Sequence, residues 1–419
     1  MRAGPGVATG LGGDFNRIWS AYTVQTIGEG VLIAALPLLA ARVTGNPLLI
    51  SWVGFAQELP WLLLAIPGGI IVDRHDRRRL MLGAQAGQAA ALLVVATLAS
   101  LHLTWLWALY LLAFVLGSGD VIVSSASKAI IPALVAKDQF EKANARNVTV
   151  ETIGRQFAGP PLGSALFAFA LPLPFWFNAI TYLLSLILIK QVRHQPGRFL
   201  VESPNAVSGS RWKGATEGIR FLMANPLLRA VILLACVSNF TLFMSQAVLV
   251  LFAHTVLGVG STGYGILVAG MALGGVAGGF TSHRIVEKVG TRRLVRIVPL
   301  LSGLSLLLIG LVGRNMVIVI CLYFVRSANL AIWNVMAQSL SQRMVPNELR
   351  GRTISAGRMI AFGSLPLGAL AGGLVASDIS LPATWTIGGA IHLLVALSFL
   401  PVLLKWPREA APEPAVKTA

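Results

Sequence analysis

The chain has 419 residues, of which 55% are hydrophobic and only 12% are charged, and its formal net charge is +17. The charged fraction is about half of the ~25% found in soluble domains, and the apolar residues recur in runs of about 18–26, enough to cross a bilayer core about 30 Å thick. Because the positive charges lie in short clusters between these runs, the composition argues against nucleic-acid binding and predicts an all-α membrane protein.

Twelve apolar stretches are candidate transmembrane helices. In chain order they are 17–41, 48–72, 80–101, 104–126, 148–171, 174–191, 228–253, 262–282, 294–313, 315–340, 354–376 and 382–404. The long polar segment between the sixth and seventh stretches contains Pro, Gly, Ser and mixed charge, and its second part is amphipathic and expected at the membrane surface. The predicted organisation is therefore a six-helix bundle over 1–191, a cytoplasmic linker over 192–226, a second six-helix bundle over 227–405 and a cytoplasmic tail over 406–419.

The Lys and Arg residues are distributed very unevenly between the two sets of alternate loops. Of the 33, one set together with both termini holds 29, and the opposite loops hold Arg42 and Arg314. Arg155 and Arg326 fall inside predicted spans. The positive-inside rule then predicts a multi-pass protein of the cytoplasmic membrane, with both termini and the linker in the cytoplasm.

A charged cluster, GGIIVDRHDRRRL at 68–80, follows the second predicted span, and a similar stretch, GGFTSHRIVEKVGTRRL, occurs near residue 279. In the same way GPPLGSAL at 159–166 corresponds to LPLGALAG at 365–372. These separations of about half the chain indicate a six-span unit used twice. Many secondary transporters have this plan, with the substrate site near the middle of the membrane between the halves.

The cluster at 68–80 resembles the signature G-x-x-x-D-R-x-G-R-[RK] of the major facilitator superfamily. The matching residues are Gly69, Asp73, Arg74, Arg77 and Arg78. Asp76 stands where the family usually has glycine, and aspartate tolerates the positive φ that a glycine there permits. The stretches IGEGVLIAALPLL, IPALVAKDQFEKANA, GIRFLMANPLLRA and VPNELRGR resemble the bacterial branch that contains macrolide efflux pumps and the enterobactin exporter. The resemblance implies two pseudo-symmetric six-helix bundles, the major facilitator fold, and a monomeric transporter.

The resemblance also implies that the loop after the second span is a cytoplasmic gate. Asp73 is expected to approach the N-terminus of the eleventh helix near Thr353, where free N–H groups favour an anion. Arg77 is expected to reach Asp120 in the fourth helix, and the glycines at 68–69 to let the second and eleventh helices approach closely. The alternative is that the arginines only anchor the topology.

The fifth predicted span combines small residues with two prolines. Its motif consists of Gly159, Pro160, Pro161 and Gly163. These residue types predict a kink and close helix packing. The stretch also resembles a Gly-Pro motif associated with antiporters, but it is equally well explained as a packing kink with no bearing on transport.

Carboxylates deep within the predicted spans are candidate proton-coupling groups, because charge at membrane depth is costly. Glu29 and Glu58 lie deep within their spans, Asp120 is a further candidate nearer the cytoplasmic end, and Glu29 is the leading candidate. Tyr22 and Gln25 share a helical face with Glu29, and the resemblance implies that this helix lines the substrate cavity. Burial favours the neutral form of a carboxyl group, so such a residue can exchange a proton near neutral pH. The alternative for Glu29 is a structural ion pair.

Glycines on either side of Glu29, at 28 and 30, are expected to open space around it. Arg155 is a candidate partner of Glu29 or Glu58, or a structural residue. Further polar and aromatic residues in the seventh and tenth predicted spans are candidates for the substrate cavity. They are Asn239, Gln246, Arg326, Asn329 and Trp333. Arg326 is expected to bind an acidic substrate group or to pair with Glu29, and Asn239 and Gln246 are as well explained by hydrogen bonds between helices.

The sequence predicts a proton-coupled antiporter that exports a drug-like or natural-product small molecule by alternating access, with a siderophore among the candidate substrates. Alternatives are an uptake transporter or facilitator for a small metabolite, or a lysolipid-moving protein. Neither a metal-ligand cluster, a catalytic constellation nor a Walker motif is found in the sequence. We therefore expect no enzyme activity, no cofactor and no metal, with the proton gradient as the driving force.

Overall fold

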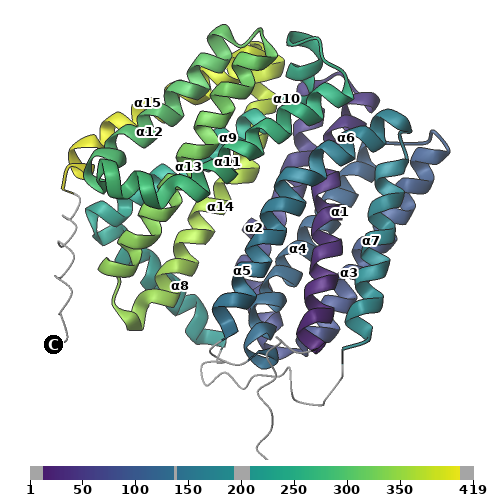
Figure 1. Cartoon of the computed structure of the whole chain (residues 1–419), viewed down its shortest axis with the longest axis horizontal. Coiled ribbons are helices and arrows are strands. Elements are labelled where there is room, and N and C mark those ends of the chain that lie inside the picture. The colour runs from purple at the N-terminus through teal and green to yellow at the C-terminus, as the bar shows by residue number, and fades with distance from the viewer. Residues whose placement is uncertain (1–12, 136–138, 193–207, 406–419) are drawn as a thin grey trace, which may run out of the picture.

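The computed structural model describes residues 13–135, 139–192 and 208–405, and every regular element within these ranges is a helix. The first half contains α1 (Gly13–Val43), α2 (Pro47–Arg74), α3 (Arg77–Ser100), α4 (Leu106–Leu134), α5 (Phe140–Val150), the π-helical segment η2 (Glu151–Ala158), α6 (Gly159–Phe169) and α7 (Leu173–Lys190). The second half follows the linker helix α8 (Ser208–Ala224) and contains α9 (Pro226–Gln246), α10 (Leu249–Leu251), the π-helical segment η3 (Phe252–Val256), α11 (Ser261–Val289), α12 (Thr291–Val312), α13 (Met316–Met344), α14 (Asn347–Asp378) and α15 (Leu381–Leu403). Figure 1 shows the halves as two bundles side by side, the first in purple to teal and the second in green to yellow.

Eleven helices of the described chain are long and apolar enough to cross a membrane. They coincide with the predicted spans except the fifth, which falls on the end of α5, on η2 and on α6. Helical hydrogen bonding continues through all three segments but changes register at η2, so that no single helix there has the length of a span.

The change of register at η2 follows from the two prolines. Pro160 and Pro161 have no backbone N–H, so they cannot donate to the preceding turn, and the helix must adjust there. The N–H of Gly159 donates to the carbonyl of Gly154, five residues earlier, as in a π-helix. The kink predicted for the fifth span is therefore a π-helical segment that leads into α6.

Capping residues mark where two of the helices begin. Asn46 caps α2 by accepting from the N–H groups of the second and third residues of the helix, and Pro47 occupies its first position. Asn225 and Pro226 repeat this arrangement at the start of α9. Proline suits the first turn because its missing N–H would have no helical partner there.

Two pairs of helices join the halves: α2 packs along α14, and α6 along α11. The rings of Trp61 on α2 and Phe362 on α14 are stacked with centroids 5.8 Å apart. Gly265 on α11 lies directly against Ser164 on α6, where a larger residue would overlap it. Small residues at such crossings allow the close helix contact that replaces the hydrophobic effect inside a membrane.

The described part of the linker is the helix α8, which packs against α14 and α9. Leu222 is buried in the apolar core of the second half, and Glu217 forms an ion pair with Arg352 of α14. The remainder of the linker, 193–207, and the predicted tail, 406–419, lie outside the described residues. The cysteines differ in placement: Cys236 is half-buried, but Cys321 is exposed on α13, where lipid would surround an outward-facing side chain.

Candidate functional site

A cavity of about 220 Å³ lies between the two halves. Its walls come from α1, α2, η2, α9, α10 and α11 and are mostly apolar, with Phe243 and Tyr264 among them. The polar side chains that line it are Gln57, Glu58, Arg155 and Gln246. An apolar cavity with a few converging polar groups is the usual form of a small-molecule site, and its position between repeated halves is that of a transporter.

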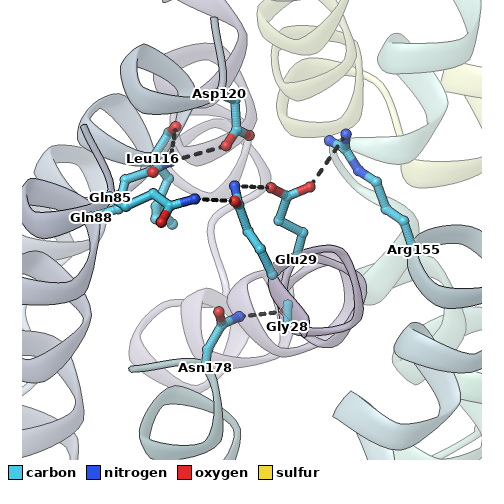
Figure 2. A network of polar contacts seen from close by, with 9 residues as sticks. Gly28, Glu29, Gln85, Gln88, Leu116, Asp120, Arg155 and Asn178 are labelled. Atoms are coloured by element: carbon cyan, nitrogen blue, oxygen red, sulfur yellow. Dashed lines mark hydrogen bonds and ion pairs between the residues drawn. The ribbon is translucent and has the colours of Figure 1, made fainter. Parts of the chain in front are cut away.

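An ion pair stands at the wall of this cavity. Nη1 of Arg155 lies 3.6 Å from Oε2 of Glu29, and the two side chains are 35% and 15% exposed. Nε2 of Gln25 donates to the other carboxylate oxygen of Glu29 at 2.8 Å. Figure 2 shows the carboxylate of Glu29 pointing toward the guanidinium of Arg155. The carboxylate is therefore fixed by groups from α1 and η2.

A chain of hydrogen bonds anchors Gln25 in the first bundle. Its Oε1 accepts from Nε2 of Gln85 on α3 at 2.5 Å, and Oε1 of Gln85 accepts from Oγ of Ser185 on α7 at 3.0 Å. Gln25 is only 2% exposed and so lies inside the bundle. Neither Gln25 nor the half-buried Tyr22 is among the described residues that line the cavity, which corrects the expectation that this stripe of α1 faces it.

Helix α1 meets η2 and α6 at very short range because both sides have glycine. A Cβ on Gly30 would lie 2.6 Å from the carbonyl oxygen of Gly154. Gly159 lies directly against Gly30, and Gly163 against the carbonyl of Val31. This approach brings the backbone of η2 to the level of Glu29, so that Arg155 can reach it. The motif predicted in the fifth span thus positions the ion pair.

Gly28 has a packing role as well. Nδ2 of Asn178 on α7 donates to its carbonyl oxygen, and a Cβ at this position would lie 2.7 Å from the side-chain oxygen of Asn178. The expectation that glycines at 28 and 30 open space around Glu29 is therefore wrong. They close the distance from α1 to α7 and to η2.

Two further carboxylates lie near the ion pair. Oδ1 of Asp120 accepts from Nε2 of Gln88 at 3.0 Å, as Figure 2 shows. Gln88 lies about 16 Å along α3 from Arg77 at 1.5 Å per residue, so the expected contact of Arg77 with Asp120 is wrong. Glu58 lines the cavity and makes no hydrogen bond or ion pair with any residue the structure describes.

The charged cluster after α2 is only partly described. Gly69 lies in α2, but the side chains of Asp73 and Arg74 are outside the described residues, so the expected contact of Asp73 stays a prediction. Thr353 is buried beneath α8, whose Gly218 lies directly against the backbone of this turn. Gly68 faces Val121 of α4, 3.3 Å from its Cβ position, and not α14 as expected.

Among the described arginines of the cluster, Arg78 has partners at the end of a neighbouring helix. Nε of Arg78 donates to the carbonyl of Ile189 at 3.1 Å and Nη2 to that of Lys190 at 2.8 Å, at the C-terminus of α7, where a cation is favoured. Arg77 is 6% exposed. Asp76 has φ of −60° and caps α3 by accepting from Arg79 N at 3.0 Å. Aspartate is found here as a helix cap and not because of a positive φ.

The candidates of the second half lie mostly inside its own bundle. Arg326 is 4% exposed and donates to the carbonyls of Ser238 and Ser302 at 3.2 and 3.4 Å and to Oγ1 of Thr241 at 3.4 Å. These partners are neutral oxygens of α9 and α12, so the expected pairing with Glu29 is absent among the contacts of the described chain. Nδ2 of Asn239 donates to the carbonyl of Ala361 at 3.0 Å, a hydrogen bond between helices.

Trp333 and Asn329 are 5% and 6% exposed and do not belong to the described lining of the central cavity. Trp333 lines a separate cavity of about 20 Å³, together with His392. This volume has room for about one water molecule. Of the cavity candidates predicted from the sequence, only Gln246 is placed on the described wall of the central cavity.

Sequence reasoning missed the glutamines Gln57, Gln85 and Gln88. Each could have been identified as a polar amide side chain within an apolar segment. Inside a membrane such a group needs a hydrogen-bond partner from its own bundle or from a ligand. Gln85 and Gln88 form hydrogen bonds with other residues of the first bundle, and Gln57 lines the cavity. Among the described residues, no group of three His, Cys, Asp or Glu side chains is arranged to hold a metal ion.

Two repeated helical bundles with a mostly apolar cavity between them define a membrane transporter of the major facilitator fold. The model of the family described as transmembrane secretion effectors matches residues 12–417, and the chain belongs to this family of major facilitator transporters. The resemblance to the macrolide-efflux and enterobactin-exporter branch is thereby confirmed, and the relatives are transporters and not enzymes.

Individual relatives are distant but match over most of their length. Macrolide efflux protein A of Streptococcus pyogenes is 23% identical over 91% of this chain and 94% of its own. The enterobactin exporter EntS of Escherichia coli O1:K1 / APEC is 25% identical over 81% of this chain and 79% of its own. A bacterial homologue of the iron transporter ferroportin in an inward-facing state has the same fold, with a TM-score of 0.73 at 16% identity over 92% of this chain and 98% of that one.

Proposed function

We propose that this transporter is a proton-coupled antiporter that exports a drug-like or natural-product small molecule from the cytoplasm. The observation that carries the proposal is the ion pair of Glu29 and Arg155 at the wall of a cavity built by both halves. A carboxylate that is buried in a membrane and balanced by one arginine changes its electrostatic environment when it takes up a proton. The relatives named as efflux proteins and exporters support the outward direction.

The chemistry follows from the partners of Glu29. As a carboxylate it accepts from Gln25 and balances the charge of Arg155. A proton on Glu29 removes that balance, leaving a guanidinium beside the cavity without its carboxylate. A buried charge that loses its partner is strongly destabilised, so protonation must be accompanied by rearrangement around Arg155. This ties proton uptake to a change at the cavity wall.

Transport by purified protein in liposomes tests the proposal. A panel of labelled amphipathic compounds is offered with and without an imposed pH gradient. We expect accumulation against the compound's own gradient only when protons can flow in the opposite direction. Transport that ignores the pH gradient would replace antiport by the facilitator alternative, and movement of labelled lysolipid alone would favour the lipid-moving alternative.

The predicted orientation in the membrane can be tested separately. We propose that both termini and the linker are cytoplasmic, because 29 of the 33 Lys and Arg residues belong to that side. Reporter fusions at Ser203 and Ala419 are expected to report the cytoplasm, and a fusion at His102, in the turn after α3, the outside. A cytoplasmic signal at His102 contradicts this topology.

A further inference from the structure

Glu58 is a carboxyl group at the cavity wall that no positively charged side chain of the described residues neutralises in an ion pair. It lines the cavity from α2 and has no hydrogen bond or ion pair within the described chain. The charged groups near it are Arg155 from η2 and Asp120 from α4. The facing stretch of α14, 363–369, is free of charged residues. Four carboxylates, those of Glu29, Asp120, Glu151 and Glu58, therefore lie near the single guanidinium of Arg155.

The arginine already has a preferred partner. Glu29 is held toward Arg155 by Gln25, and Gln25 is in turn held by Gln85. Asp120 has the amide of Gln88. One guanidinium balances one carboxylate, so an ionised Glu58 leaves a negative charge facing the cavity while Glu29 is ionised as well.

We propose that Glu58 binds a cationic group of the transported compound, and that Arg155 is shared between Glu29 and Glu58. The substrate class is then an amphipathic organic cation, such as a protonated or quaternary amine. This inference rests on the proposed export function and narrows its substrate. The remaining walls suit such a ligand, because Phe243 and Tyr264 offer apolar contact and aromatic faces on which a cation is stabilised.

Sharing of Arg155 supplies a way to release the cation. With Glu29 ionised, Arg155 stays with it and Glu58 is available. When Glu29 takes up a proton from water on its open side, its charge disappears and Arg155 turns to Glu58. The guanidinium then replaces the substrate cation at Glu58. A proton on Glu29 and a cation at Glu58 therefore cannot be bound at the same time, because both depend on the position of Arg155. Antiport requires this mutual exclusion.

Binding to the purified, full-length protein in detergent tests this inference without any gradient. The probes are benzyltrimethylammonium, a cation, and benzenesulfonate, an anion of similar size. Their binding is measured by calorimetry from about pH 5.5 to about 8.5, because a buried carboxyl group can exchange its proton within this range of pH. We expect the cation to bind, with affinity that rises with pH, and the anion not to bind. Glu58→Gln should weaken cation binding by about tenfold or more, the loss of one charge-assisted contact, and remove its pH dependence.

Two variants distinguish this role from a structural one. Glu29→Gln frees Arg155 to pair with Glu58, so this variant should bind the cation more weakly at every pH. The double variant Glu29→Gln with Arg155→Gln should bind the cation again, because no guanidinium then competes for Glu58. Asp378→Asn, at the far end of α14, should bind as the unmodified protein does. Folding of each variant is followed by its thermal transition, and Glu58→Asp keeps the charge if Glu58→Gln fails to fold.

Cation affinity unchanged in Glu58→Gln, or binding of benzenesulfonate that is lost in Arg155→Gln, overturns the inference. Either result leaves proton-coupled export intact, because that proposal is tested by gradients in liposomes. Conversely, cation binding that depends on Glu58 together with transport that ignores pH overturns the antiport proposal and not the substrate class.

Discussion

Glu29→Gln is expected to abolish transport driven by a pH gradient while the protein still reaches the membrane. Glutamine keeps the shape of the side chain and its hydrogen bond with Gln25 but cannot lose or gain the charge that balances Arg155. Removing one partner of a buried ion pair costs about 3–5 kcal/mol when the other charge stays buried, so the thermal transition of the variant should also fall. Arg155 is 35% exposed toward the cavity, and the loss of stability should therefore lie below that range.

The measurement is uptake of a labelled substrate into liposomes with the gradient imposed in each direction. Glu287→Gln is the matched control, because Glu287 is exposed near the end of α11 and its ion pair is with His283, one turn away on the same helix. The control should transport like the unmodified protein. Glu29→Asp keeps the charge with a shorter reach and should retain partial activity. If Glu29→Gln concentrates substrate at the unmodified rate, the coupling proton is carried elsewhere, with Glu58 and Asp120 as the remaining candidates.

Gly163→Ala is expected to destabilise the folded protein severely although it adds only a methyl group. The new Cβ would collide with the backbone carbonyl of Val31, which cannot rotate away as a side chain can. Overpacking commonly costs about 1–3 kcal/mol, and here α1 and α6 must separate, which also draws η2 and Arg155 away from Glu29. We therefore expect a lower melting temperature and lower transport together.

Gly275→Ala provides the control for this change. Gly275 lies within the transmembrane helix α11 and has no atom of another described helix within 4 Å of its Cβ position. Alanine is a better helix former than glycine by about 1 kcal/mol, so this variant should be as stable as the unmodified protein or more stable. Equal melting temperatures for both variants would show that α1 and α6 are not packed as closely as described.

The sequence by itself determined the class of protein, the number of apolar segments and the family. Crossing a bilayer demands about 20 apolar residues per helix, a requirement that is local in the chain and therefore visible without a structure. The repeat of the cluster at 68–80 near residue 279 indicated two halves, and the glycines and prolines at 159–163 indicated close packing and a kink. These signals depend on neighbours along the chain, because backbone N–H groups and small side chains act over one or two turns.

Only the tertiary structure decided which buried groups meet. A transmembrane helix has apolar residues on every side, so its pattern does not fix its rotation or its neighbours, and Gln25 could not be assigned to the bundle core before α3 and α7 were in place. The same holds for Arg155, whose reach to Glu29 depends on the π-helical register of η2 and on glycine contacts with α1. Asp120 accepts a hydrogen bond from Gln88 and does not contact Arg77, a choice that depends on how α3 packs against α4. Packing between segments that are far apart in the sequence determines which side chains face the cavity. A pattern within one segment therefore cannot predict them.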